Sequence, residues 1–226
     1  MSLQRIREAS VRYAIGFAPV HFLTDAERRV EVSLFRKNVV ASPKTRRSYI
    51  IAMIGLVGSG KSAVAQSLAK HIGAAIVEGD VIRTHLRNEG ASFENAYQIE
   101  HDLAFEIIRK RGVAILDSDY IDAPKRAMLL HRAKFENVKV IFVRTVCDLD
   151  VMFGRIIMAD AGDFFNGASS KWMDDKTKGA AVKLRELTAR LPLHYQYQWG
   201  RGPLMRCIAP GRGSWKLKEL PFPIFA

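Results

Sequence analysis

The sequence has little of what builds a secreted or membrane-spanning protein. Only two cysteines occur in 226 residues, Cys147 and Cys207, so a disulfide scaffold is excluded and free thiols are expected. No apolar run is long enough to span a membrane, and the first residues, with Arg5, Arg7 and Arg12, do not resemble a signal peptide. The six histidines lack the spacing of a metal site. These absences predict a cytoplasmic protein with no membrane partner.

The net charge is positive, but it is unevenly distributed. Lys and Arg number 35 against 23 Asp and Glu, a formal charge of +12. Residues 1–48 hold 10 basic and 4 acidic side chains, residues 49–150 hold 13 of each, and residues 151–226 hold 12 and 6. The excess therefore lies in two flanks around a neutral centre. Such flanks can attract nucleic acid, an anionic membrane surface or a polyphosphate ligand, or they can simply be solvated.

The first 48 residues are predicted to be a helical extension. Apolar residues at helical spacing indicate one helix between Ile6 and Phe17. The run Thr24-Asp25-Ala26-Glu27 has the form of a capping box and predicts the start of a second helix. The apolar positions expected on that second helix are Ala26, Val30, Phe35 and Val39.

Strands and helices alternate from residue 49 onward. Apolar runs predict strands over 49–54, 74–77, 113–116 and 138–143, and helical patterns fall at 62–72, 81–88, 97–111, 124–135 and 148–161. This order is typical of a three-layer α/β/α domain with a central parallel sheet. Beyond it we expect a loop over 162–179, a helix over 180–191, and short strands at 205–208 and 215–217. Residues 49–226 are therefore predicted to form one domain.

The most specific motif follows the first strand. It reads Gly55-Leu56-Val57-Gly58-Ser59-Gly60-Lys61-Ser62 and fits G-x-x-x-x-G-K-[ST] between an apolar strand and an amphipathic helix. Glycines let the backbone curl so that successive N–H groups bind phosphate oxygens, and the helix N-terminus adds positive potential. Lys61 can reach the β and γ phosphates of ATP, and Ser62 can hold Mg²⁺. The predicted nucleotide-binding residues are Gly55, Val57, Gly58, Ser59, Gly60, Lys61 and Ser62.

With this motif, residues 49–160 resemble the P-loop NTPase superfamily, and within it the small-molecule kinases and the AAA-domain predicted kinases. The resemblance implies ATP and Mg²⁺ as cofactors, a strand order 2-3-1-4 with a possible fifth strand, and a lid over about 155–180. No Asn-Lys-x-Asp run is present, which disfavours a GTPase, and no Leu-Ser-Gly-Gly-Gln run, which disfavours a transporter ATPase. Ser118 stands where ring-forming motors place Glu, so motor activity is not expected.

A second motif, Glu78-Gly79-Asp80-Val81-Ile82-Arg83, follows the second strand, at the edge where parallel sheets bind ligands. It resembles a segment of adenylylsulfate kinases. That resemblance makes Asp80 a catalytic base or metal organiser and Arg83 a clamp for an anionic group of the acceptor. The alternatives are that Asp80 caps the helix at Val81 and that Arg83 is solvated.

A third motif, Leu116-Asp117-Ser118-Asp119, ends the third strand. Asp117 occupies the Walker B position, where a carboxylate can hold Mg²⁺, and it should lie near Lys61 and Asp80. Asp119 is either an acceptor-site residue or a turn residue. Arg155 stands where the kinases place a lid arginine that stabilises the transferred phosphoryl group, but the second lid arginine is missing from 156–158.

Together these motifs predict an ATP-binding P-loop kinase. It would transfer the γ-phosphoryl group of MgATP to the hydroxyl of a small, anionic acceptor such as a nucleotide or a phosphorylated metabolite. The alternative is an ATP-dependent nucleic-acid-binding protein or switch with slow hydrolysis, its basic flanks binding RNA or DNA. Asp80 and Arg83 favour the kinase, and the missing second lid arginine favours the switch.

Overall fold

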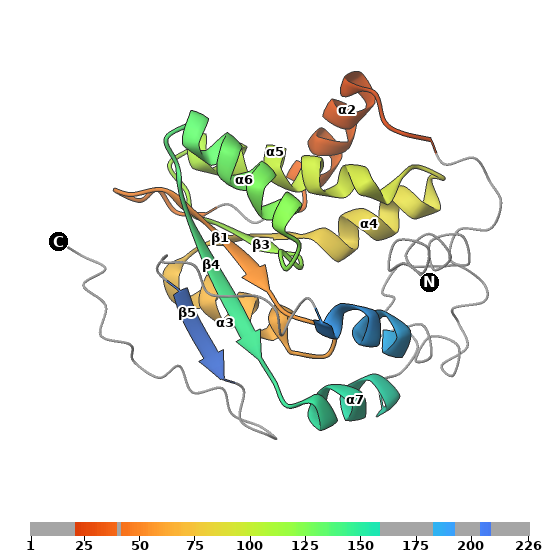
Figure 1. Cartoon of the computed structure of the whole chain (residues 1–226). Coiled ribbons are helices and arrows are strands. Elements are labelled where there is room, and N and C mark those ends of the chain that lie inside the picture. The colour runs from red at the N-terminus through yellow and green to blue at the C-terminus, as the bar shows by residue number, and fades with distance from the viewer. Residues whose placement is uncertain (1–20, 40–41, 159–182, 193–203, 209–226) are drawn as a thin grey trace.

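The computed structural model describes residues 21–39, 42–158, 183–192 and 204–208 (Figure 1). The helix predicted near the N-terminus, the loop over 162–179 with most of the lid, and the strand predicted over 215–217 lie outside the described residues. Among the described residues, no helix is both long and apolar enough to cross a membrane.

A parallel five-stranded sheet forms the centre of the structure, in the order β2-β3-β1-β4-β5. The predicted order 2-3-1-4 is confirmed, and the fifth strand is the one predicted over 205–208. The strands are β1 (Tyr49–Ile54), β2 (Ala75–Glu78), β3 (Ala114–Asp117), β4 (Lys139–Val146) and β5 (Leu204–Ile208). β4 extends beyond its predicted end through Arg144, Thr145 and Val146. These residues stay in the strand because they pair with β5, and Arg144 also pairs with the last residue of β1.

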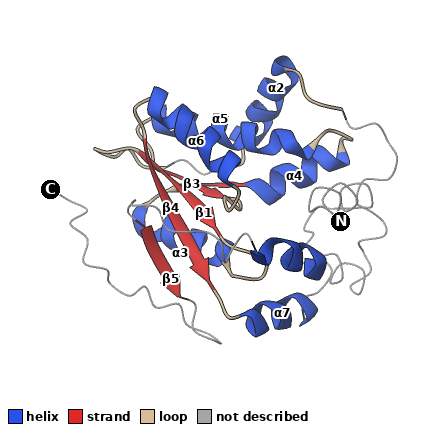
Figure 2. Cartoon of the chain, in the orientation of Figure 1, coloured by secondary structure: helices blue, strands red, loops and turns tan. Residues whose placement is uncertain are grey.

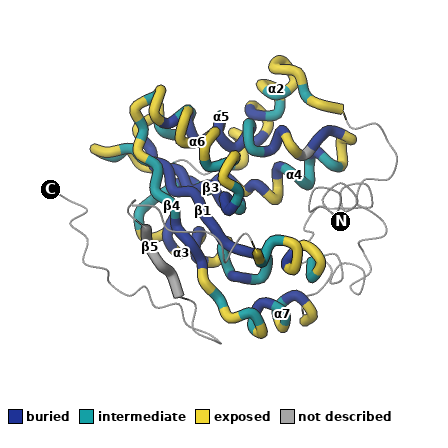
Figure 3. Tube along the Cα trace, viewed as in Figure 1, coloured by how far each residue is buried: buried dark blue, intermediate teal, exposed yellow. Residues whose placement is uncertain are grey.

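Helices cover both faces of the sheet, as Figure 2 shows. They are α2 (Asp25–Arg36), α3 (Lys61–Ile72), α4 (Gly79–Asn88), α5 (Ala96–Arg109), α6 (Ala123–Phe135) and α7 (Leu149–Met158), with a 3₁₀ turn at Phe93–Asn95 and a further helix over 183–192. Alternate residues of β1 enter different clusters, because successive side chains of a strand point to opposite faces. Ile50 and Ile54 pack with α2, α4, α5 and α6, whereas Ile51 and Met53 pack with α3. β1 and β3 are buried between these two layers (Figure 3).

The capping box predicted at Thr24 is confirmed at the start of α2. Glu27 N–H donates to Thr24 Oγ1 at 3.3 Å, and Thr24 N–H donates to Glu27 Oε2 at 2.7 Å. The predicted apolar positions are partly wrong: Phe35 is buried, but Val30 is 67% exposed and Val32 takes the inner position instead. Ion pairs of α2 with α5 fix which face turns inward, including Arg28 with Asp102 at 3.1 Å.

A third apolar cluster lies at the carboxyl end of β1. Leu56 of the glycine-rich loop packs there with Met152 and Ile156 of α7 and with Leu187 of the 183–192 helix. These two helices therefore stand beside the loop that carries the first motif (Figure 1).

Candidate active site

The glycine-rich loop joins β1 to α3 and has the backbone expected of a phosphate cradle. Gly58 and Gly60 have φ of +77° and +85°, in the left-handed region that favours glycine. Gly60 directly precedes α3, so the N-terminus of that helix opens onto the loop. Left-handed turns beside a helix N-terminus present consecutive N–H groups to an anion.

The base of the loop is fixed to the sheet. Ser59 Oγ lies 2.8 Å from Thr145 Oγ1 of β4, and both hydroxyls are buried. A side chain at Gly55 would place its Cβ only 2.0 Å from Thr145 Oγ1. The N–H groups of Gly55 and Ser59 donate within the protein, to Asp119 Oδ1 and to Leu56 O. The N–H groups of the other loop residues are therefore the better candidates for phosphate contacts.

Arg155, the predicted lid cation, reaches the same loop from α7. Its Nη1 donates to Gly58 O at 2.9 Å and lies 3.6 Å from Cys147 Sγ. A Cβ at Gly58 would lie 3.0 Å from Met152 O, so α7 packs directly on the loop. Arg155 is thus beside the predicted phosphate site, whereas residues 159–180 of the predicted lid lie outside the described residues.

Asp117 ends β3 beside the start of α3. The Ser62 hydroxyl hydrogen-bonds to it, and burial raises the pKa of Asp117 while the positive charge of Lys61 acts in the opposite direction. Its Oδ1 is buried and has no hydrogen-bond partner among the described residues. Magnesium prefers carboxylate, hydroxyl and phosphate oxygens and needs only one or two protein ligands. Ser62 and Asp117 therefore fit the ion that the P-loop fold implies.

Asp80 and Arg83 form an ion pair on α4, facing the same edge of the sheet. Arg83 Nη2 lies 2.6 Å and Nε 3.2 Å from Asp80 Oδ1. Partial desolvation opposes ionisation, but the charges of Arg83 and Lys61 outweigh it and hold the pKa of Asp80 below its usual range. α4 begins at Gly79, so Asp80 lies inside the helix and is not its N-cap. The structure thus brings Asp80, Asp117 and Lys61 together, as predicted.

Two acidic residues of this edge were not predicted as site residues. Glu78 lies opposite Asp117 in the β2–β3 register, and burial and the charges of Asp117 and Asp80 raise its pKa. Its place in the second motif was the available signal. Glu100 of α5 is completely buried, and burial raises its pKa to about 7 although Arg83 favours the ionised form. No local pattern distinguished it from the other α5 residues.

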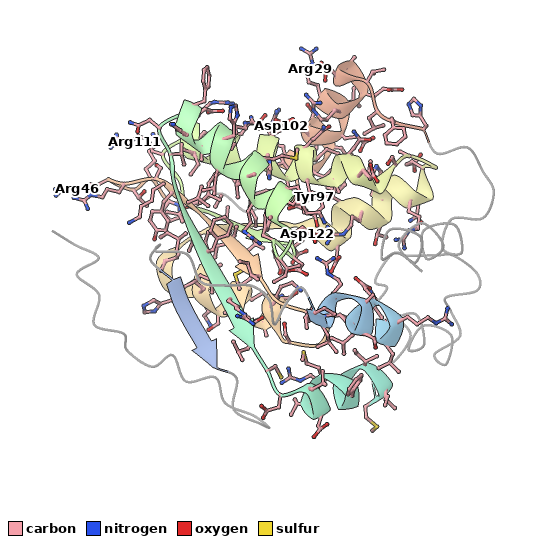
Figure 4. All side chains as sticks on the ribbon, viewed as in Figure 1. Arg29, Arg46, Tyr97, Asp102, Arg111 and Asp122 are labelled. Atoms are coloured by element: carbon pink, nitrogen blue, oxygen red, sulfur yellow. The ribbon has the colours of Figure 1, made fainter. Side chains whose placement is uncertain are left out.

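Aromatic and basic side chains lie next to Arg83. Tyr97 has Arg83 at 5.6 Å and Lys125 at 4.1 Å from its ring centroid, and Lys125 Nζ donates to the Tyr97 hydroxyl at 2.6 Å. Lys125 also pairs with Asp122 at 3.1 Å. Tyr97 and Asp122 are labelled in Figure 4, where they mark this part of the site. Its components come from α5, α6 and the loop after β3, so it exists only in the folded chain.

Asp119 lies in the loop after β3 and has several protein partners. Its Oδ1 accepts from Gly55 N–H at 3.3 Å and from Ile121 N–H at 3.1 Å, and its Oδ2 pairs with Arg190 of the 183–192 helix at 2.9 Å. A carboxylate that accepts from the N–H two residues later is typical of a turn. These contacts favour the turn alternative and make Asp119 a link between that helix and the glycine-rich loop.

Comparison with known proteins agrees with this geometry. Residues 50–158 match the model of a family described as an AAA domain. A proposed kinase from Chloroflexus aurantiacus has a TM-score of 0.52 at 20% identity, over 72% of this chain and 89% of that one. A structure of the PezAT toxin–antitoxin system of Streptococcus pneumoniae has a TM-score of 0.51 at 13% identity, over 71% and 75%. The APS kinase CysC of Mycobacterium tuberculosis, with AMPPNP and APS, has a TM-score of 0.44 at 20% identity, over 76% and 92%.

No curated protein matches the sequence. At the identities given above, likeness to solved structures shows the fold alone. The fold, the glycine-rich loop and the family match nevertheless agree with one another. Residues 50–158 thus match the AAA-domain family model, and the chain shares its fold with the proposed kinase from Chloroflexus aurantiacus.

Proposed function

We propose that this protein is an ATP-dependent kinase that phosphorylates the hydroxyl of a small, anionic acceptor. The observation that carries the proposal is the position of the Asp80–Arg83 pair, at the same sheet edge as Lys61 and Asp117. A phosphate cradle alone serves many reactions, whereas an adjacent carboxylate–arginine pair suits a second substrate with a hydroxyl and an anion.

In this reaction the bond between the γ-phosphorus and the oxygen of ADP breaks while a bond to the acceptor oxygen forms. The loop N–H groups and Lys61 hold the phosphates, and Ser62 and Asp117 would hold a Mg²⁺ ion, which would supply positive charge to neutralise them. Asp80 orients the acceptor hydroxyl and receives its proton, and Arg83 binds the acceptor's anionic group. Arg155 adds positive charge beside the loop. Little proton abstraction is needed before transfer, because the transition state is loose, so positioning dominates.

The test is label transfer from γ-labelled ATP with Mg²⁺ to pooled nucleosides, nucleotides, sugars and 5′-hydroxyl oligonucleotides. We expect label on one pool only. Lys61→Ala should abolish transfer, because it removes the cation that contacts the phosphates, whereas Asp80→Asn should keep ATP affinity and lose transfer by about 100-fold or more. Label found only as free phosphate with every pool would contradict the kinase.

A second candidate is the nucleic-acid-dependent ATPase or switch. Exposed basic residues at the opposite end of the sheet, among them Arg46 and Arg111, favour it. Its signature differs from that of the kinase: RNA or DNA would change the rate of ATP turnover without becoming labelled.

A further inference from the structure

Glu100 is a buried carboxyl group that the proposed chemistry leaves without a role. Its side chain is 0% exposed. Ser118 Oγ donates to its Oε1 at 2.5 Å, and the Tyr120 hydroxyl donates to its Oε2 at 3.1 Å. Burying an ionised carboxylate costs free energy unless a group of opposite charge lies close to it. The ionised Glu100 therefore needs a cation beside it.

That partner is Arg83, which Glu100 contacts from behind. Arg83 Nη1 lies 3.7 Å from Glu100 Oε1 and donates to Ser118 Oγ at 3.3 Å, and this same hydroxyl donates to Glu100. The other side of the guanidinium, Nη2 and Nε, binds Asp80. Arg83 therefore lies between two carboxylates of opposite exposure: the Asp80 side chain is 84% exposed, and the Glu100 side chain is fully buried.

A glycine makes the inner contact possible. A Cβ at Gly79 would lie 1.8 Å from Ser118 Oγ and 2.0 Å from Glu100 Oε1. Any side chain at this position would push the Glu100 carboxyl and the Ser118 hydroxyl away from their present places. The start of α4 is thus shaped around the pair that holds Arg83.

The carboxylates of Asp80 and Glu100 respond differently when an acceptor binds. An anionic group that binds the outer side of Arg83 competes with Asp80, which is exposed and can rotate away. Glu100 is enclosed and stays. The same event releases Asp80 from the cation that lowers its pKa, so its basicity rises when a hydroxyl is at hand.

We propose that Glu100 is a positioning residue that keeps Arg83 in the acceptor site while Asp80 exchanges its ion pair with Arg83 for the acceptor hydroxyl. The acceptor must then carry both an anionic group and a hydroxyl, and one without the anion would fail to release Asp80. The catalytic part of this inference rests on the proposed kinase function, but the holding of Arg83 by Glu100 does not.

The holding role is tested without catalysis, by the NMR signal of the Arg83 Nη1 hydrogens, the part of the guanidinium that faces Glu100 and Ser118, in the full-length protein at pH 8, where Glu100 is ionised. Asp80→Asn should leave that signal protected, because Glu100 and Ser118 still hold the guanidinium. Adding Glu100→Gln to Asp80→Asn should speed its hydrogen exchange by about tenfold or more. The matched control is Asp80→Asn with Glu106→Gln, which removes another α5 carboxylate, one that pairs with Arg36 instead.

Release of Arg83 by Asp80→Asn alone would overturn the proposal, as would equal protection in the two double variants. Should Glu100→Gln fail to fold, Ser118→Ala replaces it and removes only the hydroxyl between the two groups. With the acceptor found by label transfer, Glu100→Gln should raise KM for the acceptor by about tenfold and leave KM for ATP unchanged. If no acceptor is ever labelled, the kinase function fails while the NMR result still decides the role of Glu100.

Discussion

At the scale of single residues, two glycines in helices differ in the space available for a side chain. Gly79 begins α4 beneath the Glu100–Ser118 contact, with no space for a side chain. Gly154 lies within α7, where a Cβ would meet no atom of the described residues within 4 Å. Neither has a positive φ, so the difference between them is one of space and not of backbone conformation.

Alanine at the two positions should therefore have opposite effects. Gly79→Ala should lower the free energy of unfolding by about 1–3 kcal/mol, because buried groups must move to admit the methyl group. Gly154→Ala should raise it by about 0.5–1 kcal/mol, since alanine is the better helix former and the space is open. Urea unfolding of both variants measures this. A Gly79→Ala variant as stable as the wild type would show that the Glu100 contact is not tightly packed.

The same scale shows which site residues a sequence can reveal. Asp80, Arg83 and Asp117 were found because they belong to motifs at the carboxyl ends of strands, and parallel strands end at one edge. Glu100 and Tyr97 reach that edge only because α5 packs against α4 and β3, a long-range consequence that no local spacing records. Predictions from motifs are therefore strongest for loops at strand ends and weakest for helix faces turned toward a site.

At the scale of elements, the start of α2 is easier to predict from the sequence than the side of the helix that is buried. Its start depends on the local Thr24–Glu27 contact, which the sequence spells out. Its buried side depends on the partners offered by α5, so Val32 faces inward although Val30 fits the helical spacing as well. The predicted buried face of α2 was wrong because either of two sets of apolar residues could face inward. Packing against the rest of the protein selects one of them.

Thr24→Ala should destabilise α2 by about 1 kcal/mol, because removing the Thr24 hydroxyl leaves the Glu27 N–H group without its acceptor. Ser33→Ala is the control: Ser33 is exposed on the same helix and, within the described part of the chain, its hydroxyl donates to Arg29 O of the preceding turn, so alanine should be neutral there. Hydrogen bonds from the Thr24 N–H group, from the Thr24 hydroxyl and from His21 lower the pKa of Glu27 from 4.5 to about 2. The cap's contribution is therefore present above pH 4.5 and is lost as pH falls toward 2.

Unfolding of the two variants at neutral and acid pH measures this difference, and amide hydrogen exchange shows whether the change is confined to α2. Equal stabilities of Thr24→Ala and Ser33→Ala at neutral pH would mean that the packing of Val32 and Phe35 alone fixes the helix.

At the scale of the whole molecule, charge separates the two ends of the sheet. The carboxyl ends carry the mixed acidic and basic groups of the site. The amino ends carry exposed Lys44, Arg46, Lys110 and Arg111, and Thr45 N–H donates to Arg111 O at 2.8 Å, which joins the two segments. Figure 4 shows Arg46 and Arg111 at this same end. Residues of the neutral central segment thus lie beside residues of the basic N-terminal flank. Counting charges segment by segment along the sequence could not show this.

Charge-reversing substitutions at this basic end test the switch alternative. If it is a nucleic-acid site, the protein should bind a labelled single-stranded RNA with an affinity that falls steeply with salt. Arg46→Glu with Arg111→Glu should then weaken binding and reduce the salt slope by about 1.4, the loss of two phosphate contacts. The control, Arg29→Glu with Arg185→Glu, makes the same change of net charge at exposed residues of α2 and the 183–192 helix.

Equal weakening by both pairs would mean that RNA responds to net charge alone, without a site at the amino ends. Even localised binding favours the switch only if RNA also changes the rate of ATP hydrolysis, because the basic end and the P-loop lie at opposite ends of β1. Binding that leaves ATP turnover untouched would make the basic end a separate docking surface and leave the kinase as the function of the site. The turnover measurement with RNA therefore separates the two functions, and the affinity alone does not.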